Sequence, residues 1–136
     1  MLIEGYNGVY PAAVTPKDDS GSFSVKRMEA LISRLYESKV HGLYLCGNTG
    51  EGYLLPLEAR KEAVEVAVEA SKGKGKVIVH VGAPAEEDAV ALAKHAAEAG
   101  ADAISSLPPY VQGYSFEEVY AHYTRLAYAS GLPTFV

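Results

Sequence analysis

Short apolar runs alternate with longer amphipathic segments along the 136-residue chain. The first three runs are almost continuously apolar, which is typical of strands that are covered on both faces in a parallel sheet. The pattern predicts five β-strands, of which the last is only begun at the end of the sequence. These strands cover residues 8–16, 42–47, 76–82, 102–109 and 133–136.

Two helix-length segments separate the first three predicted strands. The first carries apolar residues at spacings of three and four, which form one stripe on a helix: Val25, Met28, Leu31, Ile32 and Leu35. The second runs from Leu57 to Ser71, and Pro56 before it suits a first helical turn. Both segments are therefore predicted to be helices that cover the sheet.

Two further helices are predicted from their end signals. The third begins with three acidic residues at 86–88, whose charges favour the positive end of a helix, and it ends at Gly100. The fourth begins with a capping box made by Ser115 and Glu118 and ends at Gly131.

The resulting order is β-α-β-α-β-α-β-α-β, with strand starts separated by 34, 34, 26 and 31 residues. Right-handed parallel crossovers of this length build either a doubly wound sheet or a (β/α)₈ barrel. A closed barrel takes about 250 residues. If the architecture is a barrel, residues 1–136 form its N-terminal half, with four βα units and the start of a fifth strand. Such a half barrel has open sheet edges and exposed apolar faces.

Composition narrows the class of protein. The chain is 49% apolar and 21% charged, as expected for one soluble domain. Its net charge of −5 and scattered basic residues argue against nucleic acid or an anionic membrane as a partner. The sequence has neither an apolar run of about 18 residues nor a signal peptide, and its single cysteine suits a reducing compartment. We therefore expect a cytoplasmic protein.

The segment Gly47–Gly52 is the strongest candidate for a binding site. It follows the second predicted strand, at the carboxyl end where parallel α/β proteins place their ligands. Its backbone NH groups, with the side chains of Asn48 and Thr49, could hold a small anion such as a carboxylate. It has neither the P-loop spacing nor that of a dinucleotide site. From spacing alone, a plain βα turn is an equally good interpretation.

Other candidate residues have simpler interpretations. Tyr110 follows the fourth strand and could orient a substrate, although an aromatic ring packed beneath a loop is the more common case. Cys46 and His80 are expected to be buried strand residues, and Lys17 a solvated loop residue. The four histidines show no metal-ligand spacing, so we predict no metal and no other cofactor.

Five segments together resemble the N-terminal half of the N-acetylneuraminate lyase and dihydrodipicolinate synthase family. They are "AAVTP", "GLYLCGNTGEGYLL", "VIVHVGA", "HAAEAGADAISSLPPY" and "SFEEVYAHYTRLAYASGLPTFV", and they cover essentially the whole chain. The Gly-x-Thr-Gly-Glu turn is the most specific of these features. "HVGA" and "SFEE" are more similar to the sialate-lyase branch.

The resemblance implies a (β/α)₈ barrel that carries out class I aldol chemistry on pyruvate or a related 2-keto acid. In this family a lysine forms a Schiff base with the keto group, a tyrosine relays protons and the turn holds the carboxylate. Carboxylate binding carries over to Thr49 and, within the same turn, Gly50. Asn48 stands where the family usually has Ser or Thr and cannot serve as a hydroxyl relay. Tyr110 falls where many members have the first of two aromatic residues, and Val111 replaces the second.

The sequence ends at Val136, before the positions at which the family has its relay tyrosine and Schiff-base lysine. The resemblance therefore implies a carbon–carbon lyase, but we expect no catalytic residue in this chain and no aldol activity from it alone. An alternative is a noncatalytic half barrel that completes its sheet as a homo-oligomer or with a second chain. A small flavodoxin-like enzyme is a further alternative, which the five-segment match disfavours.

Overall fold

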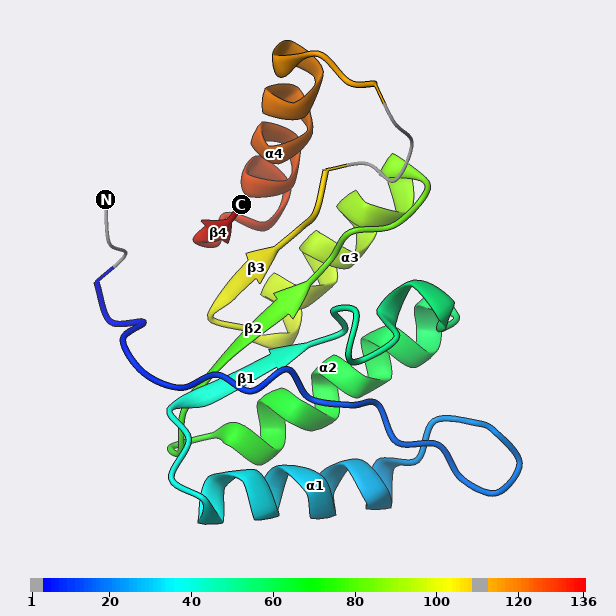
Figure 1. The fold of residues 1–136 in the computed structure, drawn as a ribbon, viewed down its shortest axis with the longest axis vertical. Coiled ribbons are helices and arrows are strands. Elements are labelled where there is room, and N and C mark those ends of the chain that lie inside the picture. The colour runs from blue at the N-terminus through cyan, green and yellow to red at the C-terminus, as the bar shows by residue number, and fades with distance from the viewer. Residues whose placement is uncertain (1–3, 109–112) are drawn as a thin grey trace.

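A computed structural model describes residues 4–108 and 113–136 of the chain (Figure 1). Four parallel strands form one sheet in the order β1-β2-β3-β4. The strands are β1 (Gly42–Leu45), β2 (Lys76–His80), β3 (Ala103–Ser105) and β4 (Thr134–Phe135). The helices are α1 (Val25–Glu37), the short 3₁₀ helix η1 (Gly52–Leu54), α2 (Leu57–Ser71), α3 (Glu86–Ala99) and α4 (Phe116–Ser130).

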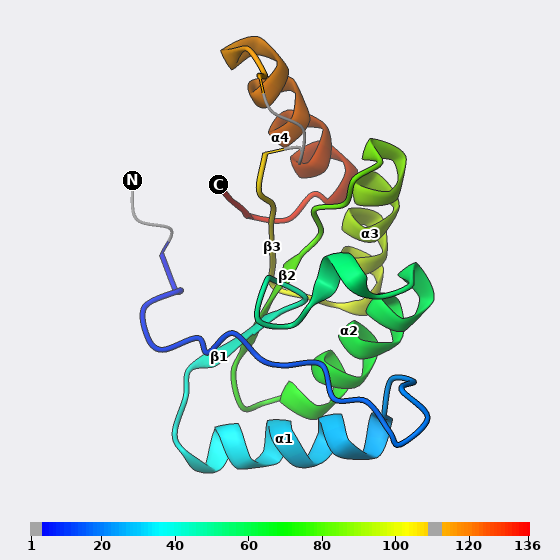
Figure 2. The ribbon, with the colours of Figure 1, turned by 45° about the vertical axis from the view of Figure 1, so that its right-hand side comes forward.

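The helices α1 to α4 lie on one side of the sheet, and both termini lie on the other (Figures 1 and 2). Each helix packs against the next in chain order, and the strands also follow one another in chain order. A doubly wound sheet would instead reverse its strand order and carry helices on both faces. The chain is therefore a partial (β/α)₈ barrel, and the flavodoxin-like alternative is wrong.

The main core lies between the sheet and these helices. Alternate strand residues such as Leu43, Val77 and Ile104 point toward the helices, where they meet Ile32 of α1 and Ala67 of α2. These side chains are at most 2% exposed. Small residues on α2 and α3 allow those helices to approach the strands closely, which gives a packed apolar layer.

The predicted helix ends are largely confirmed. Ser115 and Glu118 form a capping box at the start of α4, with both reciprocal hydrogen bonds present. Gly100 and Gly131 end α3 and α4 in the left-handed conformation, with φ of 92° and 67°. Pro56 is the N-cap of α2 rather than part of its first turn.

The first predicted strand, residues 8–16, forms no regular strand. It runs beside β1 and pairs with it through one parallel bridge, between Ala12 and Tyr44. Backbone hydrogen bonds support this bridge, from Tyr44 N to Pro11 O (3.0 Å) and from Ala13 N to Tyr44 O (2.9 Å). Proline lacks an NH donor, so Pro11 interrupts a continuous ladder. The segment nevertheless occupies the predicted place at the edge of the sheet.

The N-terminal segment also covers the amino end of the sheet's inner face, which is the face turned away from the helices. The Tyr6 hydroxyl donates to Asp102 O at 2.6 Å, and its ring contacts Phe135 edge-on at 5.3 Å. The Lys76 ammonium lies 3.9 Å from the centre of the same ring. In residues 4–108 and 113–136, no helix is long and apolar enough to span a bilayer.

Candidate functional site

The turn after β1 has an unusual backbone at both ends. Cys46 and Glu51 adopt positive φ angles of 57° and 54°, which residues other than glycine rarely do. Hydrogen bonds from Glu51 N to Asn48 O (3.0 Å) and from Gly52 N to Gly47 O (3.2 Å) close the turn. Strained backbone of this kind concentrates at functional sites, because the surrounding structure must hold it in place.

Two glycines are required because the turn folds back onto the end of β1. A Cβ atom at Gly52 would lie 1.9 Å from Cys46 O, and one at Gly50 would lie 2.9 Å from Ala13 O. The Thr15 hydroxyl donates to Gly50 O at 2.7 Å and ties the turn to the N-terminal segment. The segment between β1 and η1 is therefore held on two sides.

Three consecutive residues of this turn, the exposed Asn48 and Thr49 and the buried Gly50, have amides with no hydrogen-bond acceptor in the described part of the chain. Asn48 and Thr49 are exposed, and their side chains make no hydrogen bond within the same described ranges. Clustered NH groups without acceptors, flanked by a hydroxyl and an amide, are suited to the oxygens of a small anion.

A pocket of about 250 Å³ opens beside these amides, at the carboxyl ends of β1 and β2. Its wall consists of Ala12, Tyr44, Gly47, Asn48, Thr49, His80 and Leu107. The predicted residues Asn48 and Thr49 thus lie together in the pocket, and Gly50 adjoins them in the turn. Tyr110, the fourth predicted residue, lies outside the described residues.

His80 ends β2 and is 4% exposed, so the prediction of a hydrogen-bonded core histidine is confirmed. Its Nε2 accepts the Leu107 amide hydrogen at 3.2 Å. Burial, reinforced by the nearby Arg60 guanidinium, lowers the pKa of His80 from 6.5 to about 4. The ring is therefore neutral at physiological pH. The sequence did not indicate that His80 lines the pocket, although its position two residues before Gly82 puts it near the carboxyl end of the strand.

Tyr44 is a second pocket residue that the sequence did not indicate. Its hydroxyl accepts a hydrogen bond from Ser105 Oγ at 2.7 Å, which joins β1 to β3 across the inner face. Tyr44 is in register with Ile78 of β2, so its side chain alternates away from the helix-facing Leu43 and Leu45. This alternation was the signal available in the sequence, but the continuous apolar run concealed it.

Arg60 of α2 reaches beneath the site and is 2% exposed. It donates to His80 O at 2.7 Å and to Gly82 O at 2.9 Å. It also lies close to the Cys46 thiol, whose pKa is raised by burial and lowered to a smaller degree by Arg60. The thiol is buried and protonated, which agrees with the prediction that Cys46 is a small core residue.

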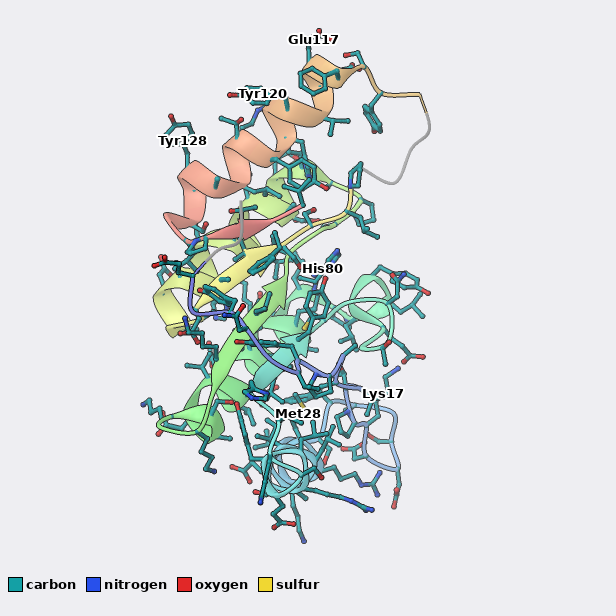
Figure 3. The ribbon with its side chains drawn as sticks, turned by 60° about the vertical axis from the view of Figure 1, so that its left-hand side comes forward. Lys17, Met28, His80, Glu117, Tyr120 and Tyr128 are labelled. Atoms are coloured by element: carbon teal, nitrogen blue, oxygen red, sulfur yellow. The ribbon has the colours of Figure 1, made fainter. Side chains whose placement is uncertain are left out.

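Lys17 lies on the same side of the molecule as the turn, in the loop before α1 (Figure 3). Its ammonium is 3.5 Å from the Glu51 carboxylate, and its side chain is 40% exposed. The prediction of a solvated loop lysine is confirmed. In the described ranges 4–108 and 113–136, no three His, Cys, Asp or Glu side chains come together as a metal site.

Comparison with known proteins agrees with this geometry. Residues 5–136 match the model of the dihydrodipicolinate synthetase family, and the chain belongs to that family. It is 36% identical over 129 residues to the N-acetylneuraminate lyase of Rhizobium meliloti, covering 95% of this chain and 43% of that protein. The match to the N-terminal part of an aldolase family, which the sequence suggested, is confirmed.

Two solved structures show the same fold. One is a catalytic lysine mutant of the sialic acid aldolase from Ruminococcus gnavus, with a TM-score of 0.93, 28% identity and coverage of 98% of this chain and 44% of that one. The other is a prophage protein of the dihydrodipicolinic acid synthase family from E. coli K12 in complex with pyruvate, with a TM-score of 0.90, 27% identity and coverage of 95% and 43%. The chain spans less than half the length of these relatives.

Proposed function

We propose that residues 1–136 are the N-terminal half of a (β/α)₈ barrel domain in a cytoplasmic, pyruvate-dependent aldolase or lyase of the N-acetylneuraminate lyase type. In this proposal the half barrel contributes the carboxylate-binding part of the active site. The observation that carries the proposal is the set of three amides without acceptors, at 48–50, beside a pocket at the carboxyl ends of the strands. Family membership and the pyruvate complex of one relative support a 2-keto acid as the ligand.

The carboxylate of pyruvate would accept hydrogen bonds from the amides of Asn48, Thr49 and Gly50 and from the Thr49 hydroxyl. Hydrogen bonds to an ionised acceptor are about twice as strong as neutral ones, which suits a turn with several aligned donors. The neutral His80 ring adds no charge to the pocket wall. Tyr110, which lies outside the described residues, is proposed to orient the substrate.

Schiff-base chemistry requires a lysine whose amine can reach the keto carbon. Lys17 is paired with Glu51 in the loop before α1 and does not line the pocket at the turn. We propose that the lysine and the proton-relaying tyrosine belong to a part of the barrel beyond these residues. The 136-residue chain alone is then expected to bind a 2-keto acid without cleaving or forming a carbon–carbon bond.

Two measurements on the ¹⁵N-labelled chain test this proposal. Pyruvate should shift the amide resonances of residues 48–50, whereas pyruvamide, which has the same shape without the negative charge, should shift them much less. Treatment with pyruvate and borohydride should leave the intact mass unchanged. Equal shifts with both ligands would contradict a carboxylate site, and a stoichiometric adduct on one lysine would contradict the proposed inactivity.

A second candidate function is assembly, in which the half barrel associates with a copy of itself or with another chain. Large apolar side chains on α4 favour it, because Phe116, Tyr120 and Tyr128 are 77%, 65% and 86% exposed. Sedimentation equilibrium distinguishes this candidate. A stable monomer at micromolar concentration would contradict it.

A further inference from the structure

We propose that His80 is a positioning residue of the candidate site, which ties the carboxyl end of β3 to that of β2 and so fixes one wall of the pocket. This inference rests on the proposed function, because the pocket is the one assigned to the 2-keto acid. It concerns a residue that binds no ligand oxygen in the proposal and acts through Leu107.

The contact itself is the first observation. Leu107 follows β3, and its amide has a single acceptor in the described part of the chain, the Nε2 atom of His80 at 3.2 Å. His80 and Ser105 are register partners in the parallel ladder, so this side-chain bond extends the pairing of β2 and β3 beyond the last regular pair. Both His80 and Leu107 line the pocket beside Thr49.

The protonation state of the ring follows from this contact. A nitrogen that accepts an amide hydrogen carries no proton, so the neutral ring has its hydrogen on Nδ1. Protonation of Nε2 would replace an acceptor with a donor facing another donor. The tether therefore exists only while His80 is neutral.

Arg60 holds the backbone of His80, whereas Leu107 contacts its ring. Its guanidinium donates to the carbonyl oxygens of His80 and Gly82, so α2 holds the backbone on both sides of Val81. The groups around the ring are the Arg60 guanidinium, the Cys46 backbone at the end of β1, whose hydrogen bond raises the pKa of the ring by less than burial and Arg60 lower it, and the Tyr44 phenol, which lines the same pocket. The positive charge of Arg60 opposes protonation of the ring and keeps the acceptor available.

The consequence is a pocket whose shape is set before a ligand arrives. Leu107 is 45% exposed and lies just after the three-residue strand β3, where its carbonyl oxygen accepts a hydrogen bond from the hydroxyl of the adjacent Ser106 at 2.7 Å. A preformed site binds more tightly because ordering its wall costs nothing at the moment of binding. Loss of the tether should therefore weaken binding of a 2-keto acid even though the three turn amides remain in place.

The test compares the 136-residue chain with two variants, His80→Gln, whose side-chain carbonyl can still accept the Leu107 amide, and His80→Leu, which cannot. At pH 7 the Leu107 amide should exchange with solvent about tenfold faster in His80→Leu, which corresponds to one lost hydrogen bond, and at nearly the original rate in His80→Gln. Pyruvate binding, followed through the amides of residues 48–50, should weaken about tenfold in His80→Leu only. Below pH 4 the original chain should lose its protection at Leu107, whereas His80→Gln should keep it.

The outcomes separate the two proposals. Equal Leu107 exchange in all three proteins would overturn the tether. Faster Leu107 exchange in His80→Leu together with unchanged pyruvate affinity would overturn the positioning role of His80. If exchange follows the expected order and pyruvate shifts no amide of the turn, the tether is supported and the proposed carboxylate site is overturned. Retained secondary structure in both variants, measured by circular dichroism, excludes unfolding as the cause.

Discussion

Helices α2 and α4 have the same length of 15 residues but very different surroundings. The helix α2 packs between α1 and α3, and five of its residues are buried. The helix α4 makes its main helix contact with α3, and His122 and Leu126 are its buried residues. Tyr120 and Tyr128 point away from the molecule (Figure 3). The centre of the half barrel, around α2, is thus a well-packed core. Its edge, at α4, has exposed apolar residues that could pack against another element.

This difference indicates where the fold and the site obtain their stability. The turn at residues 47–52, Arg60 and His80 all belong to the central region of β1, α2 and β2. An apolar groove between α4 and the end of the chain is lined by Phe116, Tyr120 and Tyr123 together with Thr134 and Val136. We therefore expect substitutions at the centre to reduce global stability and substitutions at the edge to change local order or association.

The largest effect is expected for Ile104→Ala. Ile104 of β3 is fully buried, and truncating such a side chain removes apolar contacts and leaves a cavity, at a cost of about 2–5 kcal/mol in the free energy of unfolding. Urea denaturation measures this change. Leu54→Ala is the control, because Leu54 is 63% exposed and should change stability by less than about 0.5 kcal/mol. Similar losses of unfolding free energy in both variants would contradict the assignment of Ile104 to the core and Leu54 to the surface.

The next effect concerns the pH dependence at the centre. The pKa of His80 falls from 6.5 in the unfolded chain to about 4 in the folded one, so between these values the unfolded state binds more protons. The contribution of His80 to the free energy of unfolding is therefore complete above pH 6.5 and is lost as the pH falls toward 4. The loss amounts to at most about 3 kcal/mol. His80→Gln should reduce the slope of unfolding free energy against pH in this window. An unchanged slope in the variant would assign the pH dependence to other groups.

A smaller effect is expected at the start of α4. The Ser115 side chain accepts the Glu118 amide hydrogen, and Ser115→Ala should cost about 1 kcal/mol. Because α4 lies at the edge, the loss should appear mainly as faster amide exchange in its first turns rather than as a lower global stability. Ser33→Ala on α1, an exposed position without a cap, is the matched control. Uniformly faster exchange across the sheet would show that edge and centre open together.

The smallest effect on stability is expected for Tyr128→Ser. Tyr128 is 86% exposed, so its loss should change the free energy of unfolding by less than about 0.5 kcal/mol. If α4 is an association surface, the same substitution should weaken self-association about tenfold, as measured by sedimentation equilibrium. Tyr53→Ser, a half-exposed position on η1, should leave association unchanged. If the original chain and the Tyr128→Ser variant are both monomeric, α4 is not an association surface.

The helices could be predicted well because their signals are local. The apolar stripe of α1, the capping box of Ser115 and the glycines that end α3 and α4 each act within a few residues. The first strand was less predictable. Residues 8–16 have the composition of a strand, but a regular strand needs partners for its backbone groups, and here only β1 pairs with it through one bridge.

The candidate site was predicted in part. The glycine-rich turn and its place after a strand located Asn48, Thr49 and Gly50, because parallel strands bring their carboxyl ends to one edge. The sequence did not reveal that Arg60, from the middle of a helix, would hold the carbonyl oxygens of His80 and Gly82. It also did not reveal that Tyr44 and Ser105 would meet, because contacts across 61 positions depend on register and sheet curvature.

By itself, the sequence determined the order of elements, the helix ends, the place of the glycine-rich turn and the family. The tertiary structure decided which polar groups meet at the pocket, which nitrogen of His80 accepts a hydrogen bond and which helix face is left uncovered. The physical reason is the distance along the chain over which each kind of interaction acts. Local conformation depends on neighbouring residues and backbone geometry, whereas burial, protonation and side-chain pairing arise only after distant segments have packed together.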